Sequence, residues 1–247
     1  MPTSDREHLD YQRRYYARPE RVRSRMAPVR SRYVLRHMER LLDRLDLAPG
    51  ARVVELGAGM GRFSLLLAER GYRVTAVDLS LELLDALRDE DLRRFGERRI
   101  ETVCGDAAEV ARLAPGPYDG ALGLFFLHHL PSVGAVARGA AGVLRPGARA
   151  AFCEPNAWNP AFYAQVLFTP GMTWRGDGGI ARMRPGVLRP AFESAGFTDV
   201  AIDRYGLFPP ALGNRPAFAR LEEGVERLRS LEPILAFQIV SGTYRGA

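Results

Sequence analysis

Short, mostly apolar runs alternate with amphipathic stretches from residue 51 to the end of the chain. Within the stretches between the runs, apolar residues recur every three or four positions, which is typical of helices packed on one side. Strands that alternate with helices form right-handed βαβ units and a parallel sheet covered on both faces. The first five predicted strands cover residues 52–56, 73–77, 100–104, 118–124 and 149–153.

Capping and stop signals mark where the predicted helices begin and end. A helix is predicted from Gly61 to Arg70, directly after a glycine-rich turn. Ser80 is placed to cap the next helix, because its hydroxyl can accept a hydrogen bond from a free amide of the first turn. A further helix runs up to Leu144, where the sequence Arg-Pro-Gly at 145–147 stops it.

The C-terminal part of the chain resumes the same alternation after a looser stretch. A helix is predicted over 185–195, a strand over 198–203 and a polar helix over 218–231. A last strand, over 234–240, suits the edge of a sheet.

These elements predict one α/β domain with two additions. We expect the domain over 51–247 and a helical cap segment over 1–50. The looser stretch over 155–184 is rich in aromatic residues and is predicted to be an inserted lid or acceptor segment, since unstructured loops of that length are uncommon inside compact domains.

Arginine supplies every basic residue of the chain. All 35 Lys+Arg positions are arginine, so chemistry that needs a lysine amine, as a Schiff base or a general base, is excluded. The net charge of +6 lies entirely in residues 1–44, which hold 12 arginines against 6 acids. Such a segment can bind an anion or nucleic acid, or can be a helix with a solvated arginine face.

Other features narrow the class of protein. The two cysteines, Cys104 and Cys153, have no metal-ligand spacing and no disulfide framework, and no metal site is expected. The N-terminus lacks the apolar core of a secretory signal, and no apolar run approaches the length of a membrane span. We expect a cytoplasmic protein.

The strongest chemical signal is the run VELGAGMG over residues 54–61, at the junction of the first strand and helix. Glycines there let the backbone turn tightly and approach a ligand. A dinucleotide-binding turn would need a third glycine where Arg62 stands, and would not favour Glu55 beside a pyrophosphate. The spacing is instead an acid followed by G-x-G-x-G.

With this run, the chain resembles the class I S-adenosylmethionine-dependent methyltransferases, in the small-molecule branch. The resemblance covers residues 51–154 motif by motif and the rest in outline. It implies a Rossmann-like seven-stranded sheet of order 3-2-1-4-5-7-6 with the last strand antiparallel, helices on both faces, and an N-terminal helical cap. The motifs that carry it, besides residues 54–61, are Val77-Asp78, Gly105-Asp106-Ala107, Tyr118-Asp119, Leu127-His128-His129-Leu130, Leu144-Arg145-Pro146-Gly147 and Glu154-Pro155-Asn156.

The same resemblance implies how the cofactor S-adenosyl-L-methionine and its product S-adenosyl-L-homocysteine are bound. Asp78 would accept both ribose hydroxyls and Leu79 would cover the adenine. Asp106 would accept the adenine amino group. The implied order also separates the two cysteines by three strands, so a disulfide is sterically implausible and both are expected to be core thiols. The remaining expected cofactor contacts are Glu55, Gly57, Ala58, Gly59, Gly61, Ala107, Phe125, Tyr15 and Arg32.

The acceptor side is less constrained by the sequence. The loops after the fourth and fifth strands converge on the sulfonium in this fold, which makes His129, His128 and Glu154 the candidate catalytic residues. His129 is the preferred general base, because a neutral imidazole is available at physiological pH. The histidine pair can equally shape the loop, and Glu-Pro-Asn can equally be a turn. Aromatic side chains from the cap and lid, among them Tyr16 and Trp158, are expected nearby.

Several functions remain open at this point. The first is methyl transfer to an oxygen or nitrogen of a small-molecule acceptor, and the second is carbon methylation of a quinone- or lipid-like acceptor. RNA or protein methylation is a third, although the chain has no N-P-P-Y-type motif and no nucleic-acid partner is expected. A nicotinamide oxidoreductase or a non-catalytic adenosine-binding module is the fourth. A homodimer is the expected assembly if the chain is not monomeric.

Overall fold

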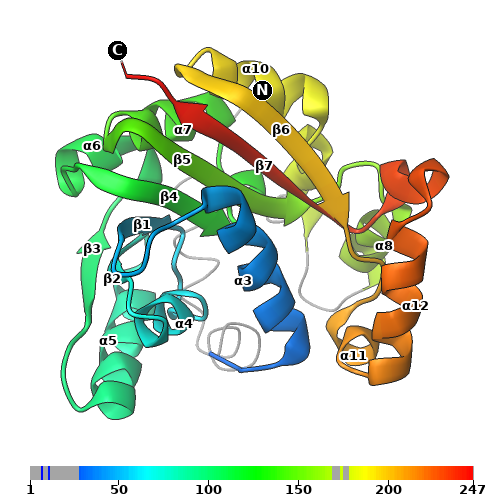
Figure 1. Cartoon of the computed structure of the whole chain (residues 1–247), viewed down its shortest axis with the longest axis horizontal. Coiled ribbons are helices and arrows are strands. Elements are labelled where there is room, and N and C mark those ends of the chain that lie inside the picture. Colours follow the sequence, from blue (N-terminus) through cyan, green and yellow to red (C-terminus); the bar gives the residue numbers. More distant parts are fainter. Residues whose placement is uncertain (1–6, 8–10, 12–27, 169–172, 175–177, 247) are drawn as a thin grey trace.

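A seven-stranded sheet forms the centre of the protein (Figure 1). The structure is a computed structural model that describes residues 7, 11, 28–168, 173–174 and 178–246. Its strand order, β3-β2-β1-β4-β5-β7-β6, confirms the order that the resemblance predicts. The strands are β1 (Arg52–Leu56), β2 (Arg73–Asp78), β3 (Ile100–Cys104), β4 (Tyr118–Leu124), β5 (Leu144–Pro155), β6 (Phe197–Tyr205) and β7 (Phe237–Tyr244).

Helices cover both faces of the sheet and enclose two apolar clusters. One cluster holds the inward faces of α3 (Arg32–Leu45), α4 (Ser64–Glu69) and α5 (Leu81–Phe95). The other holds those of α7 (Val133–Ala141) and α10 (Pro185–Glu193). The shorter helical elements are η1 (Ala107–Glu109), α6 (Val110–Leu113), η2 (Leu127–His129), α8 (Pro160–Phe168), η3 (Gly178–Arg182), α11 (Pro210–Gly213), α12 (Pro216–Glu226) and η4 (Arg229–Ile234).

The strands fill both clusters because neighbouring residues point to opposite faces. In β1, Val53 belongs to the α3 side and Val54 to the α7 side, and both are fully buried. Strands buried on both faces explain the continuous apolar runs in the sequence.

Most predicted boundaries hold, and the exceptions have local causes. Ser80 caps α5, its hydroxyl accepting from the Leu83 amide, as predicted. The helix predicted from Gly61 begins only at Ser64, because Gly61 itself has a φ of 77° and belongs to the turn. The helix before the fifth strand ends at Ala141 rather than at Leu144, which already pairs with Tyr118 in β5.

The edge position suggested by the run over 234–240 is wrong, whereas the interior, antiparallel position implied by the resemblance is confirmed. β7 lies inside the sheet, antiparallel to β5 and to β6, with Val240 opposite both Phe152 and Ile202. The run over 234–240 was too short to show this, because the buried strand continues through Ser241 and Gly242 to Tyr244. The carboxyl ends of the other six strands therefore share one edge.

The two cysteines divide differently than predicted. Both are free, and they lie on β3 and β5, which the order of the sheet separates. Cys153 is a buried core thiol as expected, but Cys104 is exposed, so its predicted core position is wrong. β3 is an edge strand, and its end is only partly covered.

Carboxylates of α12 fasten the C-terminal helices to α3. Glu222 is 4% exposed, pairs with Arg36 and accepts the Leu207 and Phe208 amides at 2.5 and 3.0 Å. Glu226 pairs with Arg36 and Arg40, at 2.5 Å each. Arginines of the basic N-terminal segment thus hold the connection between β6 and β7 in place.

We predict that Glu222→Ala lowers the free energy of unfolding by roughly 2–5 kcal/mol, because it leaves two amides without their acceptor and removes one of the two carboxylates that pair with Arg36. Urea denaturation measures the change. Glu223→Ala is the matched control: its side chain is 55% exposed and meets Arg32 at 3.4 Å, so its loss should cost less than about 1 kcal/mol. Equal effects of the two variants would show that the buried contacts of Glu222 do not stabilise the fold.

Candidate active site

The glycine-rich turn after β1 has the backbone shape that its sequence requires. Gly57, Gly59 and Gly61 have φ angles of 72°, 57° and 77°, in the left-handed region that favours glycine. The amides of Gly57 and Ala58 both donate to the Val77 carbonyl, at 2.8 and 3.1 Å. These bonds fix the turn against the end of β2.

Asp78 connects this turn to the start of α5. Its Oδ2 accepts the Gly59 amide at 2.8 Å and its Oδ1 accepts the Ser80 amide at 2.9 Å. Burial raises the pKa of Asp78, and the backbone bonds from Ser80 and Gly59 oppose that rise. A carboxylate has further lone pairs, so these bonds leave it able to accept from a ligand as well.

Asp106 lies at the same edge, one strand away. Asp78 at the end of β2 is the register partner of Cys104, two residues before Asp106. The Oδ1 of Asp106 accepts the Ala108 amide at 2.9 Å. This hydrogen bond caps η1, in which Ala107 is buried in the core. Leu79, half-buried, lies on the adjacent strand end. The structure therefore brings the predicted ribose and adenine residues together.

Glu55 is a buried acid beside the turn. It is 1% exposed, and the Ser64 hydroxyl donates to its Oε2 at 2.5 Å. Burial raises the pKa of Glu55 to about 8, with a smaller rise from Asp78 and an opposing effect of the Ser64 bond. A carboxyl group in this state is ready to ionise when a cation is placed beside it.

Glu154 anchors the loop that follows β4. It is fully buried; Oε1 accepts the amides of Phe126 and Leu127 at 2.9 and 2.7 Å, and Oε2 lies 2.5 Å from Nδ1 of His128. The ring of His129 lies against that of His128, with centroids 3.8 Å apart and the ring planes inclined by 46°. The structure thus joins all three predicted catalytic residues, with Glu154 and His128 bonded to each other and His129 outermost.

An aromatic cluster that the sequence analysis missed lies on the α3 side of this edge. The α3 helix contributes Tyr33 and His37, and Phe125 follows β4 with a φ of 58°, unusual for a residue with a side chain. The rings of Phe125 and Phe237 each meet His37 edge-on, at 5.1 and 4.6 Å. The members of the aromatic cluster are Tyr33, His37, Phe125, Phe162, Tyr205 and Phe237.

His37 is the polar member at the centre of the cluster. Its Nδ1 lies 2.6 Å from the Tyr205 hydroxyl, which in turn lies 3.1 Å from Sγ of Cys153. Its Nε2 is buried and has no hydrogen-bond partner among the described residues. Burial, followed by the charges of Arg36 and Arg40, lowers the pKa of His37 to about 3, and burial raises those of Tyr205 and Cys153.

One signal in the sequence could have identified His37. The buried face of α3 recurs at Val34, Met38, Leu41 and Leu45, and His37 lies on that face. A histidine in the apolar stripe of a helix is an observation that sequence reasoning can make.

The remaining predicted contacts fall on the N-terminal segment and the lid. Arg32 is 46% exposed and meets Glu223 at 3.4 Å. Tyr15 and Tyr16 lie outside the described residues. Tyr11, which is described, reaches the lid through its hydroxyl, 3.3 Å from Oγ1 of Thr173.

Comparisons with known proteins agree with this geometry. Residues 25–202 match the family model described as a methyltransferase domain. Over 151 residues the chain is 33% identical to a ubiquinone biosynthesis O-methyltransferase of Xanthomonas euvesicatoria pv. vesicatoria, a match that covers 60% of this chain and 58% of that protein.

Two solved structures share the fold. The geranyl diphosphate C-methyltransferase of Streptomyces coelicolor A3(2), in complex with S-adenosyl-L-homocysteine, superposes with a TM-score of 0.60 at 13% identity, over 96% of this chain and 97% of that one. The [4+2]-cyclase SpnF does so with a TM-score of 0.62 at 18% identity, over 86% and 81%. At these identities the likeness shows the fold alone.

The fold and the family match define a class I S-adenosylmethionine-dependent methyltransferase. The chain belongs to the methyltransferase domain family. S-adenosyl-L-methionine is the cofactor that this class implies. The residues present fit that group: Glu55 is a buried acid suited to an ammonium, and Asp78 is a carboxylate at the strand end beside the glycine turn. Within the described part of the chain, we find no helix with the length and apolarity of a membrane span.

We predict that Asp78→Ala weakens S-adenosyl-L-homocysteine binding at least about tenfold, since each charge-assisted hydrogen bond lost costs roughly 1.5–3 kcal/mol. Isothermal titration calorimetry measures the dissociation constant. Asp85→Ala is the control, because Asp85 is 58% exposed on α5 and pairs with Arg88. An unchanged dissociation constant for Asp78→Ala would remove Asp78 from the cofactor site.

Cofactor binding should also release a proton from Glu55. Because its pKa is about 8 in the free protein, Glu55 is protonated at pH 6–7 and must ionise to face an ammonium group. Affinity for S-adenosyl-L-homocysteine should therefore rise with pH up to about 8, and calorimetry in buffers of different ionisation enthalpy should detect the proton.

The Glu55→Gln variant should bind S-adenosyl-L-homocysteine more weakly than wild type and should release no proton on binding. The raised pKa also means that Glu55 contributes stability below about pH 4.5, which is lost as the pH rises through about 8. Unbound Glu55→Gln should lack this part of the pH dependence of unfolding. Proton release that persists in the variant would assign it to another group.

Proposed function

We infer that this chain methylates an oxygen or nitrogen of a small, aromatic acceptor. The observation that carries the proposal is the unpaired, buried Nε2 of His37, set among aromatic rings at the edge where the cofactor residues meet. A buried polar atom without a partner is costly unless a ligand satisfies it. The matching relative named as an O-methyltransferase supports the same chemistry.

The cap and lid segments are proposed to enclose this acceptor. From the predicted cap, α3 contributes Tyr33 and His37, and from the predicted lid, α8 contributes Phe162, whose ring meets Phe237 at 5.6 Å. The Tyr11–Thr173 hydrogen bond joins the two segments. We therefore propose that the cap (1–50) and the lid (155–184) cover the acceptor, while the rest of the domain (51–247) holds the cofactor.

Apolar walls and a neutral imidazole suit a direct in-line displacement. When bound, S-adenosyl-L-methionine supplies a methyl group on a sulfonium, whose charge is lost in the transfer. Apolar rings exclude water and so favour the loss of that charge. The hydrogen bond from His37 would orient the acceptor, and orientation contributes up to roughly 7–11 kcal/mol.

His129 stays the proposed general base. Glu154 is occupied by two amides and by His128, so the Glu154–His128 pair supports the loop on which His129 lies. RNA methylation is disfavoured, because the arginines of α3 pair with acids: Arg36 and Arg40 with α12, and Arg44 with Asp203 at 3.0 Å. Carbon methylation remains the alternative, since a solved structure of this fold is named as a C-methyltransferase.

A panel of acceptors with methyl-labelled donor tests the proposal. The panel pairs catechols and phenols with arylamines, non-aromatic alcohols, allylic diphosphates and RNA. Label transferred to aromatic hydroxyl or amino groups supports the proposal, and mass spectrometry locates the methyl group. Label transferred only to carbon, to RNA or to non-aromatic acceptors contradicts it.

We predict that His129→Ala lowers kcat by about 10²–10⁴-fold with the best acceptor of the panel, the usual contribution of a general base. The wild-type rate should rise with pH through an inflection near neutrality that the variant lacks. S-adenosyl-L-homocysteine affinity should stay unchanged.

His37→Phe is the comparison variant, since it keeps an aromatic ring and removes the nitrogens. It should raise KM for the acceptor and keep the pH inflection. If His129→Ala retained more than about a third of kcat, His129 would be a loop residue and the base assignment would fail.

A further inference from the structure

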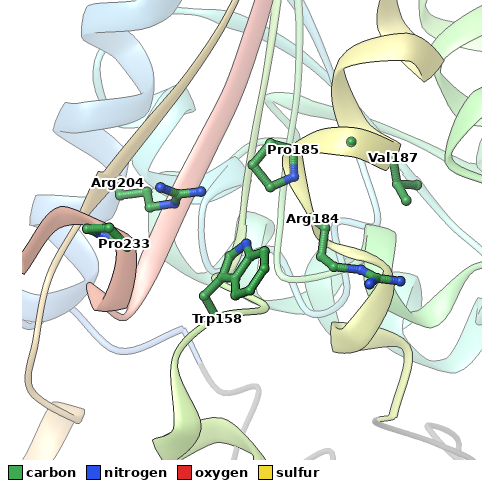
Figure 2. Close-up of a pocket in the computed structure, with 7 residues that line it drawn as sticks. Trp158, Arg184, Pro185, Val187, Arg204 and Pro233 are labelled. Carbon is green, nitrogen blue, oxygen red and sulfur yellow. The ribbon is translucent and has the colours of Figure 1, made fainter.

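A cavity opens on the opposite face of the sheet from the aromatic cluster. It measures about 650 Å³, within the usual range for small-molecule sites, and lies between the loop after β5, the end of β6, the start of α10 and η4. Figure 2 shows the indole of Trp158 between Pro233 and Arg184, below Pro185. The lining residues are Trp158, Arg184, Pro185, Gly186, Val187, Arg204 and Pro233.

Strand alternation separates this cavity from the aromatic cluster. Tyr205 points to the α3 side, where its hydroxyl meets His37 and Cys153. Its neighbour Arg204 points to the other face and lines the cavity. A ligand in the cavity would therefore not contact His37.

The walls of the cavity are fixed by buried amides. Asn156 is fully buried; its Nδ2 donates to the carbonyls of Pro233 and Leu235 at 2.8 and 2.7 Å, and its Oδ1 accepts the Trp158 amide at 3.1 Å. One side chain thus builds the Trp158 wall and the Pro233 wall together. Opposite them, Gln238 donates to the carbonyl of Met183, which precedes Arg184.

The cavity has positive charge without compensation. None of the described residues that line it is acidic, and neither Arg184 nor Arg204 has an ion pair within the described part of the chain. The Nε of Arg204 is buried, and no residue that the structure describes forms a hydrogen bond with it. By contrast, the nearby Arg182 donates to the Leu130 carbonyl at 2.8 Å.

The neighbours of Arg204 in the sheet cannot neutralise it. Gln238 is its register partner on β7, and Glu154 is the register partner of Gln238 on β5. The Glu154 carboxylate is already committed to two amides and His128, and Gln238 is neutral. A guanidinium that lines a cavity and has no ion pair among the described residues is suited to an anionic group there.

The other lining residues select a flat, apolar body for that anion. Trp158 is 58% exposed and Val187 37% exposed, although both are large apolar side chains. Indole and proline surfaces contact planar rings well. In Figure 2 the guanidinium of Arg204 extends toward Pro185, beside the indole.

We propose that this cavity is a binding site for a small aromatic carboxylate, whose acid group pairs with Arg204 and whose ring packs on Trp158. The site is separate from the cofactor residues and from the aromatic cluster. Its occupant need not be a methyl acceptor.

Calorimetric titration of 2-naphthoate into the full-length protein tests the proposal. 2-Naphthoate should bind saturably, and its neutral counterpart 2-naphthamide at least about tenfold more weakly, because it loses a charged hydrogen bond. The Arg204→Met substitution should weaken the binding of 2-naphthoate by the same factor, at least about tenfold. Arg220→Met is the matched control, since Arg220 is exposed on α12, away from the cavity.

A second pair of variants locates the ring. Trp158→Leu should weaken 2-naphthoate binding, whereas Trp174→Leu, which removes a tryptophan that is 52% exposed elsewhere, should not. S-adenosyl-L-homocysteine should bind equally well to Arg204→Met and to wild type, with or without 2-naphthoate. That result separates this site from the methyl-transfer site.

Three outcomes would overturn the proposal: equal binding of the acid and the amide, wild-type affinity in Arg204→Met, or displacement of 2-naphthoate by S-adenosyl-L-homocysteine. If Arg204→Met does not fold, as judged by circular dichroism, the proposal is tested with Arg204→Lys and with the comparison of Trp158→Leu and Trp174→Leu. Lysine keeps the charge but lacks the planar fork, so Arg204→Lys should bind 2-naphthoate more weakly than wild type.

Discussion

Hydrogen bonds from backbone amides to side-chain carboxylates shape the functional edge of this protein. Six strands end at one edge, and each following loop leaves amides that the sheet cannot satisfy. Asp78 takes those of Gly59 and Ser80, and Glu154 takes those of Phe126 and Leu127. After β6, at the other end of this edge, Glu222 accepts hydrogen bonds from the amides of Leu207 and Phe208. Acids that a sequence motif suggests for ligand binding thus also determine loop conformation.

The fold, and the arrangement of the glycine turn, Asp78 and Asp106 at one edge of the sheet, could be predicted from the sequence. The glycine turn, Asp78 and Asp106 depend on local spacing at strand ends, and the parallel sheet brings those ends together. The strands were visible as apolar runs because they are buried on both faces. Some predicted boundaries differ from the observed ones because the apolar periodicity does not report local backbone geometry, as at Gly61, whose positive φ places it in the turn before the helix.

The aromatic cluster and the surroundings of Glu154 depend on contacts between residues far apart in the sequence. His37 acquires its environment from Tyr205, 168 positions later, and no local pattern reports that approach. The paired state of Glu154 likewise depends on a loop from another strand. The run over 234–240 by itself suggested an edge strand, because its pairing with β6 is a contact between distant segments that no local pattern reports; the strand order implied by the resemblance places β7 correctly.

The antiparallel insertion of β7 has a consequence for how the polypeptide assembles as it is made. β5 gains its second neighbour only when residues 237–244 have left the ribosome, since β6 contacts β5 through β7. Until then β5 is an open edge of the kind that pairs with other chains. The glycine turn and Asp78, from residues 52–78, belong to strands synthesised much earlier. The residues of the glycine turn and Asp78 are therefore synthesised well before the strand that covers the open edge of β5.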